Sequence, residues 1–233
     1  MKTVLITGAN RGLGEALRLC FEHAGWHVIA TARRVESLPE SEQVTPLALD
    51  LSDDQSIEAL AGAVQASGHT VDLLINNAGY NPKDSADKEY FMSTFKLAHF
   101  SGANVADSLQ INALAPMELT SKLLPALAED AVVLNISSWL GSIGAKSWGG
   151  HYGYSGSKAL LNMFTRAMAL EFSEEQRAAV ALNPGWMRTA MGGEKGEVGP
   201  EEVAQAILGL YSAGTLHAES GAFLNVDGSQ HEW

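Results

Sequence analysis

The chain has 233 residues, of which 46% are hydrophobic and 18% charged, a composition typical of a folded globular protein rather than a disordered one. Its formal net charge of −12 argues against binding to nucleic acid or to an anionic membrane surface, because the 15 basic residues are scattered rather than clustered. The single cysteine, Cys20, cannot form an internal disulfide, and neither a signal peptide nor an apolar stretch of ~20 residues is present, so we expect a cytoplasmic protein.

Short apolar runs alternate with longer amphipathic stretches along the chain, a pattern that predicts βαβ units and a parallel sheet. The apolar runs are rich in Val, Ile and Leu without strict alternation, as expected of strands covered on both faces. The expected strands are Thr3–Thr7, His27–Thr31, Thr45–Leu49, Leu73–Asn76, Val132–Ile136, Ala178–Asn183 and Phe223–Val226. The expected helices are Gly12–Ala24, Ser52–Ala66, Ala103–Ala126, Tyr152–Glu171 and Pro200–Tyr211.

Two regions depart from this alternation. Tyr80–Gly102 is a long polar and aromatic insertion, and Met191–Gly199 is a short, charged, Gly-rich stretch; loops of this kind in compact domains are often functional. Ser52 is the expected N-cap of the second helix, and Pro200 lies in the first turn of the last. Because no repeat or interdomain linker is present, we predict one doubly wound α/β domain over residues 1–233.

The first expected strand runs into a glycine-rich turn and then into a helix. Glycines at such a turn allow a tight bend and close approach of the backbone to a pyrophosphate, and the helix N-terminus supplies free N–H groups and partial positive charge. The spacing over Thr7–Gly14 is TGxxxGxG rather than the usual GxGxxG. The residues of this turn that we expect to contact a dinucleotide are Gly8, Asn10, Arg11, Gly12, Leu13 and Gly14.

The end of the second expected strand indicates which dinucleotide is preferred. A site for NAD places a carboxylate there to accept hydrogen bonds from the ribose hydroxyls, and that carboxylate would repel a 2′-phosphate. Here the position is Ala32, followed by Arg33, and Arg11 lies within the glycine turn. Arginine is suited to bidentate phosphate contact, so the pattern favours NADP(H); the alternative is that both are ordinary surface arginines.

The TGxxxGxG turn is similar to a motif of the short-chain dehydrogenase/reductase family, and further segments resemble that family in the same order. They are Asn76-Asn77-Ala78-Gly79, Asn112 within Gln110–Ala113, Asn135-Ile136-Ser137-Ser138, the YxxxK segment Tyr154–Lys158, and Pro184-Gly185 with Thr189. Asn183–Gly193 and the ending Asp227–Trp233 resemble the C-factor/sniffer-like carbonyl reductase branch. The resemblance implies a Rossmann-type parallel sheet of about seven strands with helices on both faces. It also implies an NADP(H)-dependent oxidoreductase that acts on a small carbonyl or alcohol.

Tyr154 and Lys158 are four residues apart on an expected helix and therefore share one face. A lysine ammonium, together with the positive charge of oxidised nicotinamide, favours the phenolate and would lower the tyrosine pKa from about 10 towards working pH. Tyr154 could then act as the acid/base, donating its proton to the carbonyl oxygen. Tyr152 lacks such a partner, because Gly156 stands four residues after it. The resemblance further implies that Lys158 binds the nicotinamide ribose.

The resemblance implies the remaining roles. Ser138, three residues before Gly141, would orient the substrate oxygen, in preference to the adjacent Ser137. Asn112 would anchor a water in a proton relay, and Thr189 would bind the carboxamide. Asp50 would contact the adenine amino group. The other cofactor contacts implied are Leu51, Asn77, Ala78, Gly79, Pro184 and Gly185.

Other kinds of site find little support in the sequence. The seven histidines show no metal-ligand spacing, one cysteine cannot build a thiolate site, and no GxSxG elbow surrounds either serine. We therefore expect no metal. Loop aromatics expected near the nicotinamide could form an apolar substrate pocket or serve ordinary packing. They are Tyr80, Trp139, Trp148 and Trp186.

Two further matters stay open at this stage. Family members often pair through the helices that carry Asn112 and Tyr154, so a homodimer or homotetramer is implied by analogy. The rival function is that of a non-catalytic, dinucleotide-binding signalling or regulatory protein of C-factor type. It is motivated by the carboxyl-terminal resemblance and by the short segment Ala190–Pro200, which precedes the last helix.

Overall fold

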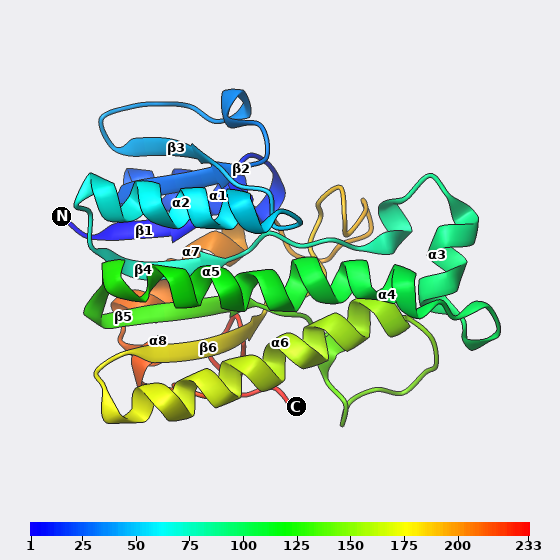
Figure 1. Cartoon of the computed structure of the whole chain (residues 1–233). Coiled ribbons are helices and arrows are strands. Elements are labelled where there is room, and N and C mark those ends of the chain that lie inside the picture. Colours follow the sequence, from blue (N-terminus) through cyan, green and yellow to red (C-terminus); the bar gives the residue numbers. More distant parts are fainter.

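The computed structural model describes residues 1–233 and contains one parallel sheet of seven strands (Figure 1). The strand order is β3-β2-β1-β4-β5-β6-β7, so the chain winds outward in both directions from the junction of β1 and β4. The predicted doubly wound fold is therefore confirmed. The strands are β1 (Thr3–Ile6), β2 (His27–Ala32), β3 (Val44–Ala48), β4 (Val71–Asn76), β5 (Leu127–Ile136), β6 (Ala178–Asn183) and β7 (Phe223–Asn225).

Helices cover both faces of the sheet, and each face has its own hydrophobic core (Figure 1). On one face the core joins the sheet to α1 (Gly12–His23), α7 (Pro200–Ser212) and the short α8 (Thr215–Ala218). On the other face it joins the sheet to α2 (Asp54–Ser67), α5 (Ala115–Leu123) and α6 (Tyr152–Glu171). None of the helices combines the length and the apolar character that crossing a membrane requires.

The expected helix Ala103–Ala126 is observed, but a π-helical turn interrupts its α-helical hydrogen bonding. It consists of α4 (Gly102–Leu109), a π-helical turn at Gln110–Leu114, α5, and a final 3₁₀ turn. Pro116 explains the interruption, because it has no N–H to donate to the carbonyl four residues earlier, which is that of Asn112.

The region Tyr80–Gly102, expected to be a loop, contains the helix α3 (Lys88–Phe95) between two 3₁₀ turns. Asp87 caps it, its carboxylate accepting hydrogen bonds from the N–H groups of Glu89 and Tyr90. The expected N-cap Ser52 is wrong: Asp53 caps α2, and Ser52 instead donates to Asp50. In Figure 1, α3 projects at the end of the molecule where the strands terminate.

Parallel strands bring the residues that follow them to one edge of the sheet, and ligands of doubly wound folds bind outside this carboxyl edge, where the strand order reverses. Gly8 follows β1, Asn77 follows β4, Ser138 follows β5 and Pro184 follows β6. The reversal lies between β1 and β4. The topology alone therefore collects the expected site residues at one place.

Candidate active site

The glycine turn between β1 and α1 is shaped by its lack of side chains. Gly8 and Gly12 have φ angles of 67° and 56°, in the left-handed region that favours glycine. A Cβ atom on Gly14 would lie 2.0 Å from the Gly8 carbonyl oxygen. The turn therefore exposes backbone at the N-terminus of α1, which fits a pyrophosphate.

The segment after β4 holds this turn in place. The Thr7 hydroxyl accepts hydrogen bonds from the backbone N–H groups of Asn77 and Ala78, each at 2.9 Å. The Asn77 side-chain amide donates to the carbonyl oxygens of Thr7 (2.9 Å) and Gly8 (3.3 Å). Two segments seventy residues apart in the sequence are thereby fixed as one unit.

The charged residues beside this turn are arranged as expected for a phosphate site. Arg11 and Arg33 are both exposed, and neither has a carboxylate within 4 Å. Ala32, at the end of β2, is buried and brings no negative charge. Hydrogen bonds from Ser52, and then the positive charge of Arg33, lower the pKa of Asp50 despite its partial burial. Near the expected adenosine side, Leu51 is buried, Asn10 is exposed, and Leu13 packs in the core.

The segment after β6 approaches the glycine turn from the opposite side. A Cβ atom on Gly12 would lie 3.6 Å from the Thr189 methyl carbon. The Asn183 side-chain oxygen, before Pro184, accepts hydrogen bonds from the N–H groups of Gly185 (3.2 Å) and Trp139 (3.1 Å). The structure thus brings Thr189 and Gly185 next to the expected cofactor and catalytic segments.

Tyr154 and Lys158 lie one turn apart on α6, with Ser138 following β5 opposite them. Lys158 is buried, and its Nζ donates a hydrogen bond to the Ile136 carbonyl oxygen at 2.7 Å. The same Nζ lies 5.9 Å from the centre of the Tyr154 ring. The three side chains expected to act together are therefore adjacent.

Burial is the largest influence on the pKa values of Tyr154 and Lys158. Burial, with a smaller contribution from the charge of Asp84, raises the pKa of Tyr154 to about 12 against the opposing effect of a side-chain hydrogen bond with Ser138. Burial lowers the pKa of Lys158 to about 8. Lys158 therefore does not by itself lower the tyrosine pKa, and the positive charge of a bound cofactor is left to supply that effect.

The neighbouring serine and tyrosine have different surroundings. The Ser137 hydroxyl points away from the site and donates to the Asn162 side-chain oxygen at 2.5 Å. Tyr152 is exposed and packs edge to face on Phe100, with ring centres 5.7 Å apart. The geometry places Ser138, rather than Ser137, beside Tyr154.

Asn112 lies in the π-helical turn and is buried. Its side-chain amide donates to the Tyr80 carbonyl (2.8 Å) and the Ser157 hydroxyl (2.9 Å), and its oxygen accepts from the Tyr80 N–H (2.7 Å). A Cβ atom on Gly79 would lie 3.5 Å from that oxygen and 3.9 Å from the Lys158 nitrogen. Asn112 thus ties the segment after β4 to α6, and π-helical turns are frequent at functional sites.

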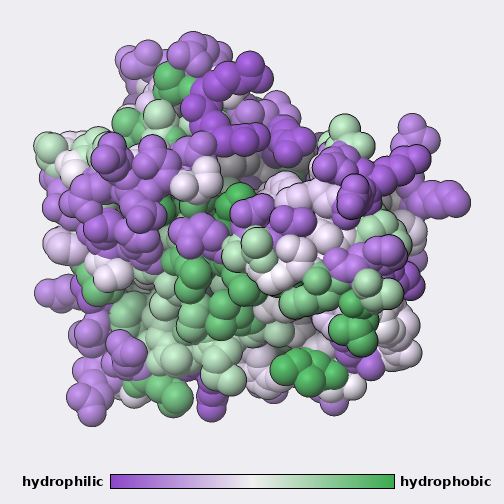
Figure 2. Space-filling model, turned by 45° about the vertical axis from the view of Figure 1, so that its right-hand side comes forward, coloured by the Kyte–Doolittle hydropathy of each residue, from purple (hydrophilic) through white to green (hydrophobic).

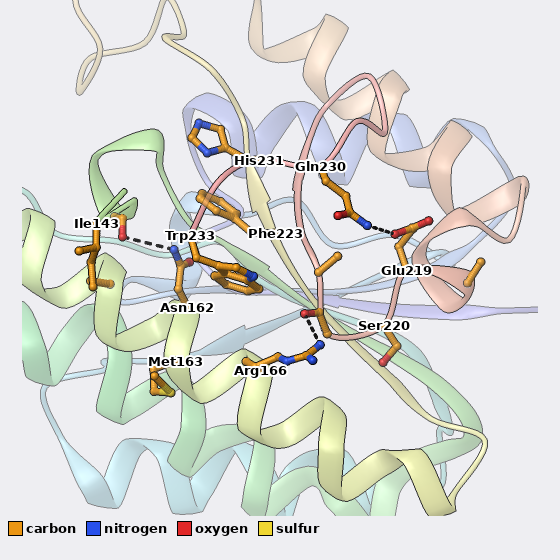
Figure 3. Close-up of a pocket in the computed structure, with 15 residues that line it drawn as sticks. Ile143, Asn162, Met163, Arg166, Glu219, Ser220, Phe223, Gln230, His231 and Trp233 are labelled. Carbon is orange, nitrogen blue, oxygen red and sulfur yellow. Dashed lines mark hydrogen bonds between the residues drawn. The ribbon is translucent and has the colours of Figure 1, made fainter. Parts of the chain in front are cut away.

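A cavity of about 650 Å³ lies outside this catalytic cluster (Figure 3). Asn162, Met163 and Arg166 of α6 line one side of it, and Phe223 and Trp233 line the other. Asn162 connects the cavity wall to the turn after β5, because the Asn162 side-chain amide donates a hydrogen bond to the Gly141 carbonyl at 3.5 Å. The cavity therefore borders the serine turn but does not contain the catalytic cluster.

Three site residues were missed from the sequence. Asn183 and Asn162 hold the turn around Ser138 from β6 and α6, and Asp84 lies close enough to Tyr154 to affect its pKa. Asn183 could have been noticed because it directly precedes the Pro-Gly pair. The other two lie in segments whose local pattern carries no signal for this site.

Comparison with known proteins agrees with this geometry. The family model for short chain dehydrogenases matches residues 2–198. The chain belongs to the short-chain dehydrogenase/reductase family. It is 34% identical over 165 residues to the C-signal protein of Myxococcus xanthus, covering 70% of this chain and 93% of that one.

Solved structures of family members cover the chain completely. A short-chain dehydrogenase/reductase from Burkholderia multivorans with bound NADP is 30% identical, with a TM-score of 0.85, over 100% of this chain and 99% of that one. The carbonyl reductase Sniffer of D. melanogaster is 27% identical, with a TM-score of 0.87, over 100% of both chains. The relatives of this short-chain dehydrogenase thus include both the C-signal protein and a Sniffer carbonyl reductase, as the resemblance of its carboxyl-terminal segments predicted.

Proposed function

We propose that this short-chain dehydrogenase is an NADPH-dependent carbonyl reductase that moves a hydride between NADP(H) and a small carbonyl or alcohol, with Tyr154 as acid/base. The proposal rests on one observation: Ser138, Tyr154 and Lys158 lie next to one another, beside a glycine turn whose backbone leaves no room for a side chain at Gly14. The Burkholderia multivorans relative with bound NADP supports the cofactor. One domain of residues 1–233 would supply every group.

The chain's own residues fit the cofactor. The backbone of the glycine turn would face the pyrophosphate. The unpaired Arg11 and Arg33 would hold the 2′-phosphate. Position 32 is an alanine, so it has no carboxylate that would repel this phosphate. Thr189 and Gly185 would contact the nicotinamide end. When bound, NADPH supplies the hydride that reaches the carbonyl carbon.

The catalytic side chains handle the oxygen of the substrate. Ser138 would donate a hydrogen bond that orients the carbonyl oxygen, and Tyr154 would transfer its phenolic proton to that oxygen. Lys158, buried and able to lose its proton near pH 8, is suited to return a proton to the tyrosine. Asn112, hydrogen-bonded beside Lys158, would position the relay that connects this nitrogen to water.

The first experiment measures NADPH oxidation with a panel of aldehydes, ketones and quinones. Tyr154→Phe should lower kcat by about 10³-fold or more while NADPH still binds, since only the transferable proton is removed. Tyr152→Phe is the matched control, because this exposed tyrosine lies two residues away on the same helix, and it should leave kcat unchanged. Turnover that survives Tyr154→Phe would refute the mechanism.

A second candidate is a signalling or regulatory protein that binds the dinucleotide without turning it over. The 34% identity to the C-signal protein favours it, as does the segment after Thr189, which folds into a compact loop by pairing Met187 with Val198. Tight NADPH binding with no oxidation across the whole panel would favour this candidate. The complete catalytic cluster supports the reductase instead.

A further inference from the structure

The loop between β5 and α6, which begins beside Ser138, carries a row of aromatic rings that we call the aromatic wall. The Trp148 ring contacts Trp139 and His151 edge to face, with centres 6.3 and 5.2 Å apart, and His151 contacts Phe95 at 4.4 Å. Trp139 directly follows Ser138, and both tryptophans are about two-fifths exposed. Figure 2 shows hydrophobic side chains gathered in the lower half of this view, at the height of α6 in Figure 1.

This wall is held in a strained conformation. His151 is the only residue other than glycine with a positive φ angle, 60°, and its N–H donates to the Phe95 carbonyl at 3.1 Å. Such strain costs about 1–3 kcal/mol and is found mainly at functional sites. Here it places the imidazole between Phe95 and Trp148, three residues before the catalytic tyrosine.

A lysine without an acidic partner lies against the same wall. The Lys146 nitrogen is 4.4 Å from the centre of the Trp148 ring and donates a long hydrogen bond of 3.5 Å to the Ser155 hydroxyl, next to Tyr154. It has no carboxylate within 4 Å. Partial burial lowers the pKa of Lys146, and no neighbouring negative charge offsets that effect.

Charged side chains lie near both the aromatic wall and Tyr154. Burial, followed by the positive charges of Lys146 and Lys83, lowers the pKa of His151 to about 4, so both cations lie near this histidine of the aromatic wall. At the catalytic end, the negative charge of Asp84 contributes to raising the pKa of Tyr154. Because Lys146 has no acidic partner, its charge is free to attract an anionic group on a substrate.

We propose that Lys146 is a specificity-determining residue that selects aromatic aldehydes and ketones carrying a carboxylate. The substrate ring lies against Trp139 and Trp148, its carbonyl faces Tyr154, and its carboxylate accepts a charge-assisted hydrogen bond from Lys146. This inference rests on the proposed reductase function, because it assigns the substrate class of the same site.

The test compares 3- and 4-carboxybenzaldehyde with their methyl esters, which differ in charge. In each reaction a hydride from NADPH bonds to the carbonyl carbon and a proton to its oxygen, so that the products are a benzyl alcohol and NADP⁺. We expect kcat/KM for at least one of the two acids to exceed that of its ester by about tenfold at low salt, with the ratio falling as ionic strength rises.

Lys146→Met should bring the ratio of acid to ester close to one, by lowering kcat/KM for the acids more than for the esters. Lys122→Met is the matched control, because it removes the same charge from α5, where Lys122 pairs with Glu58 and Glu118 far from this wall. It should preserve the ratio. Equal rates for acids and esters in the unmodified protein, or a preference that survives Lys146→Met, would overturn the inference.

A measurement without turnover separates this inference from the proposed function. Quenching of tryptophan fluorescence by 4-(hydroxymethyl)benzoate and by its methyl ester should show tighter binding of the acid, lost in Lys146→Met and kept in Lys122→Met. If no member of the wider panel of aldehydes, ketones and quinones is reduced, the proposed function fails. If panel members are reduced but the four aldehydes are not, or the esters are reduced as fast as the acids, only the role of Lys146 fails.

Discussion

The two sides of the active site are built differently. On the cofactor side, the glycine turn is fixed by several hydrogen bonds between Thr7, Gly8 and the segment after β4, and no side chain fits at Gly14. On the substrate side, the loops present half-exposed rings of Trp139, Trp148 and Trp186 to solvent. Cofactor binding therefore depends on a backbone turn that is fixed by hydrogen bonds. Substrate choice depends on loop side chains, which can change without disturbing that turn.

Among the changes that test this comparison, the largest expected effect on binding comes from disturbing the glycine turn. Gly14→Ala puts a methyl group 2.0 Å from the Gly8 carbonyl oxygen, so the backbone must move, and we expect NADPH affinity to fall by about 100-fold or more. NADPH fluorescence titration measures this. Gly62→Ala in α2 meets nothing within 4 Å and should leave affinity unchanged. Normal binding by the Gly14 variant would show that the turn is not the cradle.

Lys158 joins the two sides, and its burial predicts a pH-dependent stability. Its folded pKa of about 8 lies below the ordinary 10.5, so between these values the unfolded chain binds more protons and stability rises with pH. Relative to Lys158→Met, the unmodified protein should gain up to about 3 kcal/mol of unfolding free energy between pH 8 and 10.5. Urea unfolding at several pH values tests this, and a constant difference would contradict it.

The smallest effect concerns the support of the serine turn. Asn162→Ala leaves the buried Ser137 hydroxyl without its acceptor and loosens the turn that carries Ser138. We expect kcat to fall about tenfold with KM for NADPH unchanged, because the cofactor side is untouched. Met163→Ala, on the exposed side of α6 and lining the same cavity, is the control. Equal loss in both variants would mean general destabilisation.

Much of the fold could be predicted because its signals are local. Buried parallel strands such as Ala178–Asn183 are continuous apolar runs, and their order along the chain, alternating with helices, implies a doubly wound sheet. The start of β5 at Leu127 was missed because Glu129 and Asp130 interrupt its apolar run, where pairing with β4 is irregular. The π-helical turn was missed because helix periodicity continues through it.

The candidate site could be predicted only where a motif carries it. Tyr154 and Lys158 were found because helical spacing relates them, and the glycine turn because it follows the first strand. The Asn183 contacts could not be found in this way, since they join residues forty-four positions apart through strand pairing. Lys146 was missed for a similar reason: its proximity to Trp148 and Ser155 depends on how a loop without regular structure folds.

The carboxyl-terminal residues line the cavity and also pair with the outer edge of β7. Gln230 pairs antiparallel with Leu224, and backbone hydrogen bonds link Asn225 to Ser229 and His231 to Phe223, so the outer edge of β7 is already occupied. At the opposite edge, Pro46 in the middle of β3 offers no N–H. Both features disfavour extension of the sheet by a further strand. A second copy of the chain is therefore expected to associate through helix faces, and edge-to-edge aggregation is disfavoured.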